Sequence, residues 1–272
     1  MAEPTFGCYV YCVVRAAERP ALEGLAGVEP ASGVGVVTHG GLSALVSRVR
    51  LEEFGADALR RNLEDLAWVE RTARAHDAVL ARALTVDAVV PLRLCTIFAD
   101  EARVREMLGR EQEPLLEALE RLSGHAEWSV KLLADPRKLE AAARERIPAA
   151  TATPAPEGES PGHAFFARRK LERELRDEAH ALAEAAAADA HERLRERAAA
   201  ATLLPPQHPD LSRRSGQMVL NGAYLVHRSR AEEFATVARE FDERRRAMGL
   251  QVELSGPWAP YNFVAATEER HE

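Results

Sequence analysis

The sequence predicts an α+β protein of 272 residues made of two domains. Two observations lead to this prediction. Short runs typical of β-strands alternate with longer runs of helical periodicity along the chain. A stretch rich in Pro, Ala, Thr and Gly then separates the two portions at residues 147–162. We therefore expect an N-terminal α+β domain over residues 1–135, a connector with a mobile loop over 136–162, and a second α+β domain over 163–272.

The order of elements in the first domain is close to a ferredoxin-like split βαβ fold, with some rearrangement. Residues 6–14 are apolar at both odd and even positions, as in a strand that is buried on both faces. Residues 34–38 and 42–49 flank a His-Gly-Gly turn signal and predict a hairpin. One long amphipathic helix is predicted by the apolar residues that recur at helical spacing, namely Leu59, Leu63, Leu66, Ala73, Leu80 and Leu84.

Two further strands and a helix complete the predicted first domain. The strands are expected at residues 88–94 and 126–132, the second of them half-buried because apolar and polar residues alternate. Asp100 is expected to cap the helix between them. Pro114 lies inside that helical pattern and should kink or divide it.

The second domain is expected to contain one long helix and a βαβ-like unit. Residues 163–201 are almost wholly helix-forming, and a double proline is expected to end the helix. A buried strand at 218–226, a helix around 234–248 and an alternating strand at 250–254 should follow. The sequence leaves open whether these strands form a separate sheet.

Composition narrows the class of protein. The net charge of −7 argues against general nucleic-acid binding, which favours a strongly basic face. No run approaches the roughly 20 apolar residues that span a bilayer, and the N-terminus lacks the pattern of a signal peptide. Three scattered cysteines favour a reducing compartment without disulfides. A cytoplasmic protein is therefore expected.

The sequence contains no motif that calls for a catalytic residue, a metal or another cofactor. Cys8 and Cys12 lie four apart on a predicted strand, so we expect them on one face as core thiols. His76 and Asp77 could pair as a base and its orienting group, although a structural role is the simpler interpretation. Two basic clusters, at 168–170 and 244–246, are expected to form solvated helix faces with local ion pairs, a partner-docking role being the alternative.

Two runs are not explained easily by core packing. The first, residues 89–98, places Pro91 inside an apolar strand, which is expected only at a sheet edge or bulge, and adds the charged Arg93. The second, residues 256–264, places three aromatic residues between and after two prolines, which limit its flexibility. Such a segment is expected to bind a partner, to close over the protein's own core, or both. The candidate partner-binding residues are Pro91, Arg93, Trp258, Pro260, Tyr261, Asn262 and Phe263.

Six segments resemble the gas vesicle protein family GvpL/GvpF, in order and over nearly the whole chain. They are YVYCVV at the start, GGLSALVS at 40–47, HDAVLARALTVDAVVPLRLCTIF at 76–98, EWSVKLL at 127–133, VLNGAYLV at 219–226 and ELSGPWAPYNFV at 253–264. The last of these is the most distinctive. The chain departs from the family pattern at Cys12 and Cys95, where relatives commonly have glycine, and at Pro114.

The resemblance implies a modified ferredoxin-like domain followed by an α+β domain, and no catalytic residues. It also implies a minor vesicle component or assembly factor that engages the shell protein GvpA and other accessory proteins, in the cytoplasm during assembly and then on the vesicle. No nucleic acid, membrane or cofactor is implied. Whether the chain is F-like or L-like stays open. The rival hypothesis is a small-ligand-binding or enzymatic protein, since ferredoxin-like domains host many functions.

Overall fold

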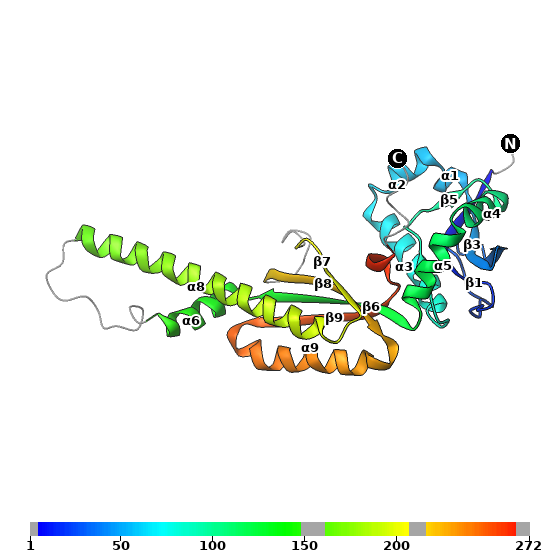
Figure 1. Ribbon diagram of the computed structural model, residues 1–272. Helices are drawn as coiled ribbons and strands as arrows, with labels where there is room; N and C mark the ends of the chain where they lie inside the picture. The colour runs from blue at the N-terminus through cyan, green and yellow to red at the C-terminus, as the bar shows by residue number, and fades with distance from the viewer. Residues whose placement is uncertain (1–4, 148–160, 207–215, 265–272) are drawn as a thin grey trace. The chain divides into compact units, whose positions relative to one another are not determined.

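A computed structural model describes residues 5–147, 161–206 and 216–264, and the side chains of 161–164 are not described (Figure 1). These residues form two compact units. Of the described residues, unit 1 comprises 5–127 together with 257–264, and unit 2 comprises those within 128–256. The division differs from the predicted one because the C-terminal segment, residues 257–264, returns to unit 1. Most of the predicted mobile loop, residues 148–160, lies outside the described residues.

Unit 1 contains an antiparallel sheet with the strand order β2-β3-β1-β4, in which β5 also pairs with β1. The strands are β1 (Phe6–Arg15), β2 (Val34–His39), β3 (Leu42–Arg50), β4 (Val90–Pro91) and β5 (Ile97–Phe98). The helices are α1 (Leu51–Phe54), α2 (Ala56–Asn62), α3 (Leu66–Ala83), α4 (Glu101–Arg110) and α5 (Gln112–Leu122).

The central strand β1 is buried on both faces, as its sequence predicts. Helices α1 and α3 pack on one face, where Phe54, Trp68 and Leu80 join a core cluster with residues of β1. Helices α4 and α5 contact the sheet elsewhere, with α4 against β2 and β3 and α5 against β1 and β4. The predicted hairpin is also confirmed: Gly40 and Gly41 both adopt positive φ, as a two-residue turn of this kind requires.

A β-bulge in β1 corrects the expectation for the two N-terminal cysteines. The pairing register with β3 shifts between Val10 and Cys12, which resets the alternation of side chains. Cys12 therefore joins the core cluster that contains Tyr9 and Tyr11. Cys8 instead lines a recess with the first residues of α4. Both thiols are buried, as expected, but they do not share a face.

The predicted long helix over 59–84 is two helices. The side chain of Asp65 accepts a hydrogen bond from the backbone N–H of Ala67 and caps a new helix, α3, that starts at Leu66. Leu66 was expected in the apolar stripe but is 82% exposed. The capping residue, rather than the leucine pattern, decides where the helix begins.

The predicted strand over 88–94 is also shorter than expected. Only Val90 and Pro91 pair with β1, and Pro91 lies in an edge strand, as its missing N–H requires. The chain then turns, with the N–H and hydroxyl of Thr96 donating to the carbonyl oxygen of Arg93. Cys95 in this turn adopts φ of 64°, a left-handed conformation.

The predicted cap at Asp100 is observed, and the predicted helix is divided into α4 and α5. Asp100 accepts a hydrogen bond from the N–H of Arg103 and caps α4. The predicted division falls at Glu111, between α4 and α5. Pro114 stands in the first turn of α5, where its missing N–H leaves no intrahelical bond unmade.

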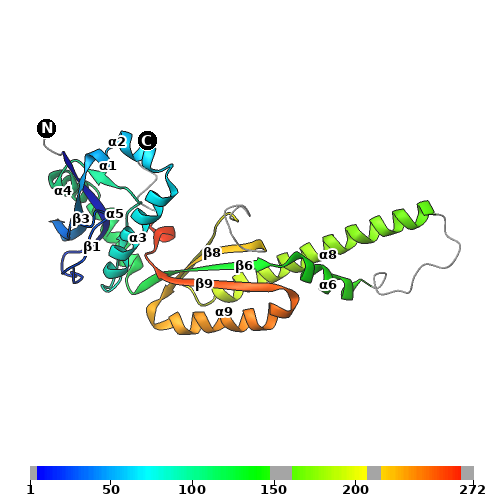
Figure 2. The same ribbon diagram turned by 180° about the vertical axis from the view of Figure 1, so that it is seen from behind.

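Unit 2 contains a separate sheet with the order β7-β8-β6-β9. The strands are β6 (His125–Ala134), β7 (Ala200–Leu203), β8 (Gln217–His227) and β9 (Leu250–Trp258). The helices are α6 (Pro136–Arg146), α8 (Pro161–Arg195) and α9 (Ala231–Arg245), with single turns η2 (Arg228–Arg230) and η3 (Arg246–Met248). Helix α6 lies beside α8, and α9 connects β8 to β9 across β6 (Figure 2).

Three expectations for this part are corrected. The strand over 126–132 belongs to the second sheet rather than the first. The long helix ends at Arg195 rather than near 201. Residues 200–203 form strand β7, which was not predicted because the alanine-rich sequence before it is typical of a helix. Strand β9 extends four residues beyond the predicted 250–254, to Trp258. The strand at 218–226 and the helix near 234–248 are confirmed.

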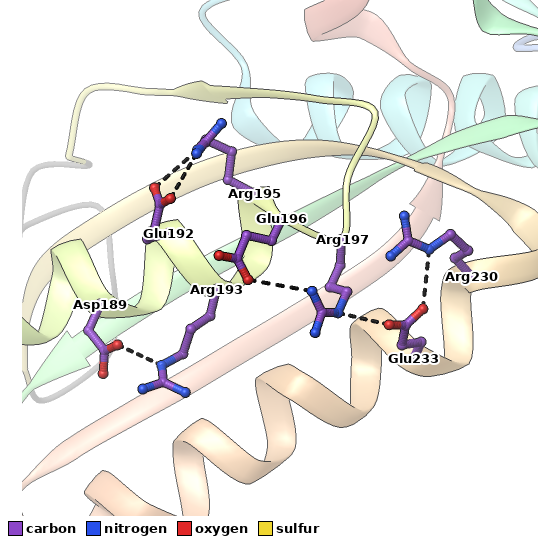
Figure 3. Close-up of polar contacts among 8 residues, drawn as sticks. All are labelled: Asp189, Glu192, Arg193, Arg195, Glu196, Arg197, Arg230 and Glu233. Carbon is purple, nitrogen blue, oxygen red and sulfur yellow. Dashed lines mark hydrogen bonds and ion pairs between the residues drawn. The ribbon is translucent and has the colours of Figure 1, made fainter.

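Ion pairs join the end of α8 to the start of α9 (Figure 3). The guanidinium of Arg197 contacts the carboxylates of Glu196 and Glu233, and Arg230 contacts Glu233 as well. Asp189 of α8 similarly pairs with Arg245 of α9. Both basic clusters of the sequence carry such pairs within or between helices, as predicted.

Replacing the α3 cap should destabilise unit 1. We expect Asp65→Ala to lower the free energy of unfolding by about 1 kcal/mol, because the N–H of Ala67 loses its acceptor. Chemical denaturation measures the change. The neighbouring Glu64→Ala, which removes no described side-chain hydrogen bond, is the control. Equal stability of the two variants would contradict the role given to the cap.

Candidate functional site

The C-terminal segment folds onto unit 1 rather than ending as a free tail. Strand β9 runs as far as Trp258, and a single turn η4 (Tyr261–Phe263) follows. Ala259 is buried in the core cluster of β1 and α3, and Val264 is buried as well. The expected closure over the protein's own core is therefore observed.

A chain of hydrogen bonds links this segment to the centre of unit 1. The Tyr261 hydroxyl lies 2.8 Å from Nε2 of His76, whose Nδ1 lies 2.9 Å from the Tyr9 hydroxyl. Tyr9 also accepts a hydrogen bond from the backbone N–H of Cys95 at 2.9 Å. Each of these partners comes from a different element, so the chain ties η4, α3, β1 and the loop after β4 together.

The geometry assigns the tautomer of His76. Tyr9 is fully buried, so its hydroxyl proton needs an acceptor. The backbone N–H of Cys95 is itself a donor and cannot accept that proton. Tyr9 therefore donates it to Nδ1 of His76. The ring proton then sits on Nε2 and is donated to the Tyr261 oxygen. The Tyr9 hydroxyl proton finds this acceptor only while the imidazole is neutral, because a protonated ring would carry N–H groups at both nitrogens.

Burial keeps this imidazole neutral. His76 is 1% exposed, and desolvation lowers its pKa from 6.5 to about 4. It bonds to two tyrosines rather than to Asp77, so the base-and-orienter pair is not formed and the structural interpretation fits. Burial also raises the pKa of Tyr9 and of Tyr261 above the ordinary value for tyrosine.

A second polar contact holds the same segment. The carboxylate of Glu127 accepts hydrogen bonds from the backbone N–H of Asn262 at 2.9 Å and from its side-chain amide at 2.6 Å. Glu127 is only 6% exposed, and burial raises its pKa, although the two bonds from Asn262 oppose that shift. Asn262 thereby satisfies both oxygens of a buried carboxylate without neutralising its charge.

An acidic aromatic recess of about 310 Å³ opens beside these contacts. We use that name for the hollow between α3 and the C-terminal segment. Its lining consists of Asp77, Leu80, Ala81, Leu84, Glu127, Pro257, Trp258, Ala259, Tyr261 and Asn262.

An apolar groove of about 330 Å³ lies at the other end of the segment. It is formed by the loop after β4 and by α4 and α5, and Val264 contributes to it. Pro91 and Arg93 both line this groove, and Arg93 is exposed.

Five of the seven predicted partner-binding residues thus fall into two groups on unit 1. Trp258, Tyr261 and Asn262 line the acidic aromatic recess, whereas Pro91 and Arg93 line the apolar groove. The other two, Pro260 and Phe263, line neither, and Pro260 is buried. Their role in partner binding stays a prediction.

Sequence reasoning missed the residues that hold the segment in place. Glu127 was expected on the polar side of an alternating strand, and the fold buries it. His76 was singled out for its neighbour Asp77, although both of its partners are distant in sequence. No local pattern marks contacts between residues 76 and 261 or 127 and 262.

The described residues show neither of two other kinds of site. No helix among them is both long and apolar enough to cross a bilayer. Nor do they bring three or more His, Cys, Asp or Glu side chains together in a way that would hold a metal ion.

Comparison with known proteins identifies the family. The family model described as "Gas vesicle synthesis protein GvpL/GvpF" matches residues 7–265. The chain belongs to the GvpL/GvpF family. Gas vesicle protein L of Streptomyces sp. (strain CB03234) is 39% identical over 96% of this chain and 94% of its own length. Gas vesicle protein F of the same strain is 31% identical over 94% and 98%.

Solved structures of the GvpL/GvpF family share the fold. GvpF from Anabaena sp. PCC7120 superposes with a TM-score of 0.68 at 20% identity, over 98% of this chain and 99% of that one. GvpF from Microcystis aeruginosa gives 0.65 at 19% identity, over 95% and 98%. The two-part α+β class with two antiparallel sheets is thereby confirmed, and the role of this family member is associated with gas vesicles.

The buried imidazole makes unit 1 sensitive to acid. Because the pKa of His76 is about 4 in the folded protein and 6.5 ordinarily, its contribution is complete above about pH 6.5 and is lost as the pH falls to 4. We expect the wild type to lose about 3 kcal/mol more stability than His76→Gln between pH 7 and pH 4. Chemical denaturation across that range measures the difference. If the free energies of unfolding of the two proteins changed equally with pH, this role of His76 would be refuted.

Proposed function

We propose that this GvpL/GvpF member acts in gas vesicle assembly, as a minor vesicle component that binds the hydrophobic shell protein GvpA and prevents its aggregation. The observation that carries the proposal is the family match over residues 7–265, which spans both units. The action belongs to the cytoplasm, where the vesicle would be nucleated with other accessory proteins.

The physical need for such a helper follows from the shell. A wall that excludes water requires subunits with large apolar surfaces, and such surfaces associate indiscriminately when they are exposed. An accessory protein that covers them until they join the wall would suppress this association. The covering surface should be apolar or aromatic, and it should be rigid before binding, so that little ordering entropy is lost.

The C-terminal segment meets both requirements. Trp258 is 47% exposed, and it precedes a turn held by the bonds of Tyr261 and Asn262. Pro257 and Pro260 limit the backbone further. Aromatic side chains on a preorganised backbone are the typical energetic centres of protein interfaces. We therefore place Trp258 at the centre of the GvpA contact.

Removing the whole segment would not test this proposal cleanly. Ala259 and Val264 are buried, so their loss would open the core of unit 1. The side chains of His76 and Glu127 would also lose the partners that satisfy them. A point substitution at an exposed side chain separates binding from folding.

Trp258→Ala should weaken capture of GvpA by about thirtyfold, because truncating a central aromatic residue costs about 2 kcal/mol. Binding of purified protein to immobilised GvpA measures the loss. Phe166→Ala is the matched control, since Phe166 is a large aromatic residue of unit 2 that is 72% exposed. Unchanged capture by a folded Trp258→Ala variant, or equal losses in both variants, would overturn the proposal.

The proposed role also predicts how many copies of this chain a vesicle carries relative to the shell subunit. We expect quantitative proteomics of washed vesicles to find far fewer copies of this chain than of the shell subunit, because a helper is needed only where the wall grows. A purely structural wall component would be retained in a constant and high ratio to the shell subunit. That second outcome would contradict the assembly role.

A further inference from the structure

We propose that the acidic aromatic recess binds the arginine side chain of a partner polypeptide. This inference rests on the proposed function, because it takes from it that this face of unit 1 binds a protein. It concerns the chemistry of recognition: a guanidinium enters the recess, between the carboxylates of α3 and β6 and the aromatic rings of the C-terminal segment.

The recess has a charge that the described residues of the chain do not balance. Two carboxylates, those of Asp77 and Glu127, line it, and its described lining contains no Lys, Arg or His. Among the described residues, the Glu127 carboxylate is bonded only to the neutral amide groups of Asn262. The Asp77 carboxylate makes no side-chain hydrogen bond or ion pair with any residue in the described ranges. A cation from outside would complement both charges.

Desolvation makes the two carboxylates better ligands for a cation. Burial raises the pKa of Asp77 and of Glu127 above their ordinary values. Both also interact electrostatically with the Tyr261 hydroxyl, and all three residues line the same recess. A cation that enters here relieves an unfavourable state of the free protein, and it does so in a setting with less screening than open surface.

The walls of the recess suit the rest of an arginine side chain. Leu80, Ala81 and Leu84 form an apolar side along α3, which can pack against three methylene groups. Trp258 and Tyr261 supply aromatic rings, and a guanidinium stacks on such rings while its N–H groups still reach carboxylates. Lysine carries a compact and strongly hydrated ammonium group, which cannot stack in this way. Arginine is therefore favoured over lysine.

A model compound tests the recess without any assumption about the partner. In an NMR titration of the full chain with Nα-acetyl-arginine amide, we expect the indole N–H signal of Trp258 to shift, with a dissociation constant in the millimolar range. The indole of the buried Trp68, which donates to Glu53 of the same unit, should not shift. Nα-acetyl-citrulline amide has nearly the same shape without the charge and should bind at least about tenfold more weakly.

Two matched variants test whether the arginine compound binds at the acidic aromatic recess. Asp77→Asn should weaken the arginine compound about tenfold, and Asp57→Asn, which changes an exposed acid on α2 of the same unit, should leave its affinity unchanged. No shift of Trp258, equal binding of the citrulline compound, or full binding by Asp77→Asn would each overturn the inference. Failure of Trp258→Ala to affect GvpA capture, with the arginine compound still bound, would instead refute the proposed function and leave the recess as a site for another partner.

Discussion

The hydrogen bonds of one buried, neutral imidazole, that of His76, hold the C-terminal segment to the central strand of unit 1. His76 receives a proton from Tyr9 and gives one to Tyr261, so one side chain of α3 satisfies partners in the central strand and in the last turn of the chain. Without His76, the proton of the fully buried Tyr9 hydroxyl would have no acceptor among the described residues, at a cost of about 1–3 kcal/mol. Glu127 and Asn262 reinforce the same closure from β6. Residues 257–264 therefore belong to the same unit as strand β1.

This closure explains how one segment can both complete a core and carry a partner-binding face. Ala259 and Val264 are buried while Trp258 remains exposed, and the two kinds of position alternate within eight residues. The buried residues fix the backbone, and the fixed backbone holds the aromatic rings and carboxylates of the recess in place. A binding surface built in this way loses little conformational entropy when a partner arrives.

Much of the fold follows from local rules in the sequence. The apolar run of β1, the glycine turn between β2 and β3, and the cap at Asp100 were all predicted and are observed. The errors arise where a nonlocal or single-residue effect overrides a pattern. Asp65 starts a helix inside a continuous leucine repeat, and a bulge after Val10 moves Cys12 to the other face. The assignment of β6 to the second sheet depends on pairing that no local pattern encodes.

The candidate site was predictable only in part. Trp258, Tyr261 and Asn262 were expected from their unusual composition, but the residues that anchor them lie 135 and 185 positions away. Amide hydrogen exchange tests the closure most directly. We expect the amides of Asn262 and Phe263 to exchange as slowly as those of β1, because their hydrogen bonds open only when unit 1 unfolds. Exchange at the rate of an unstructured peptide, while β1 stays protected, would contradict it.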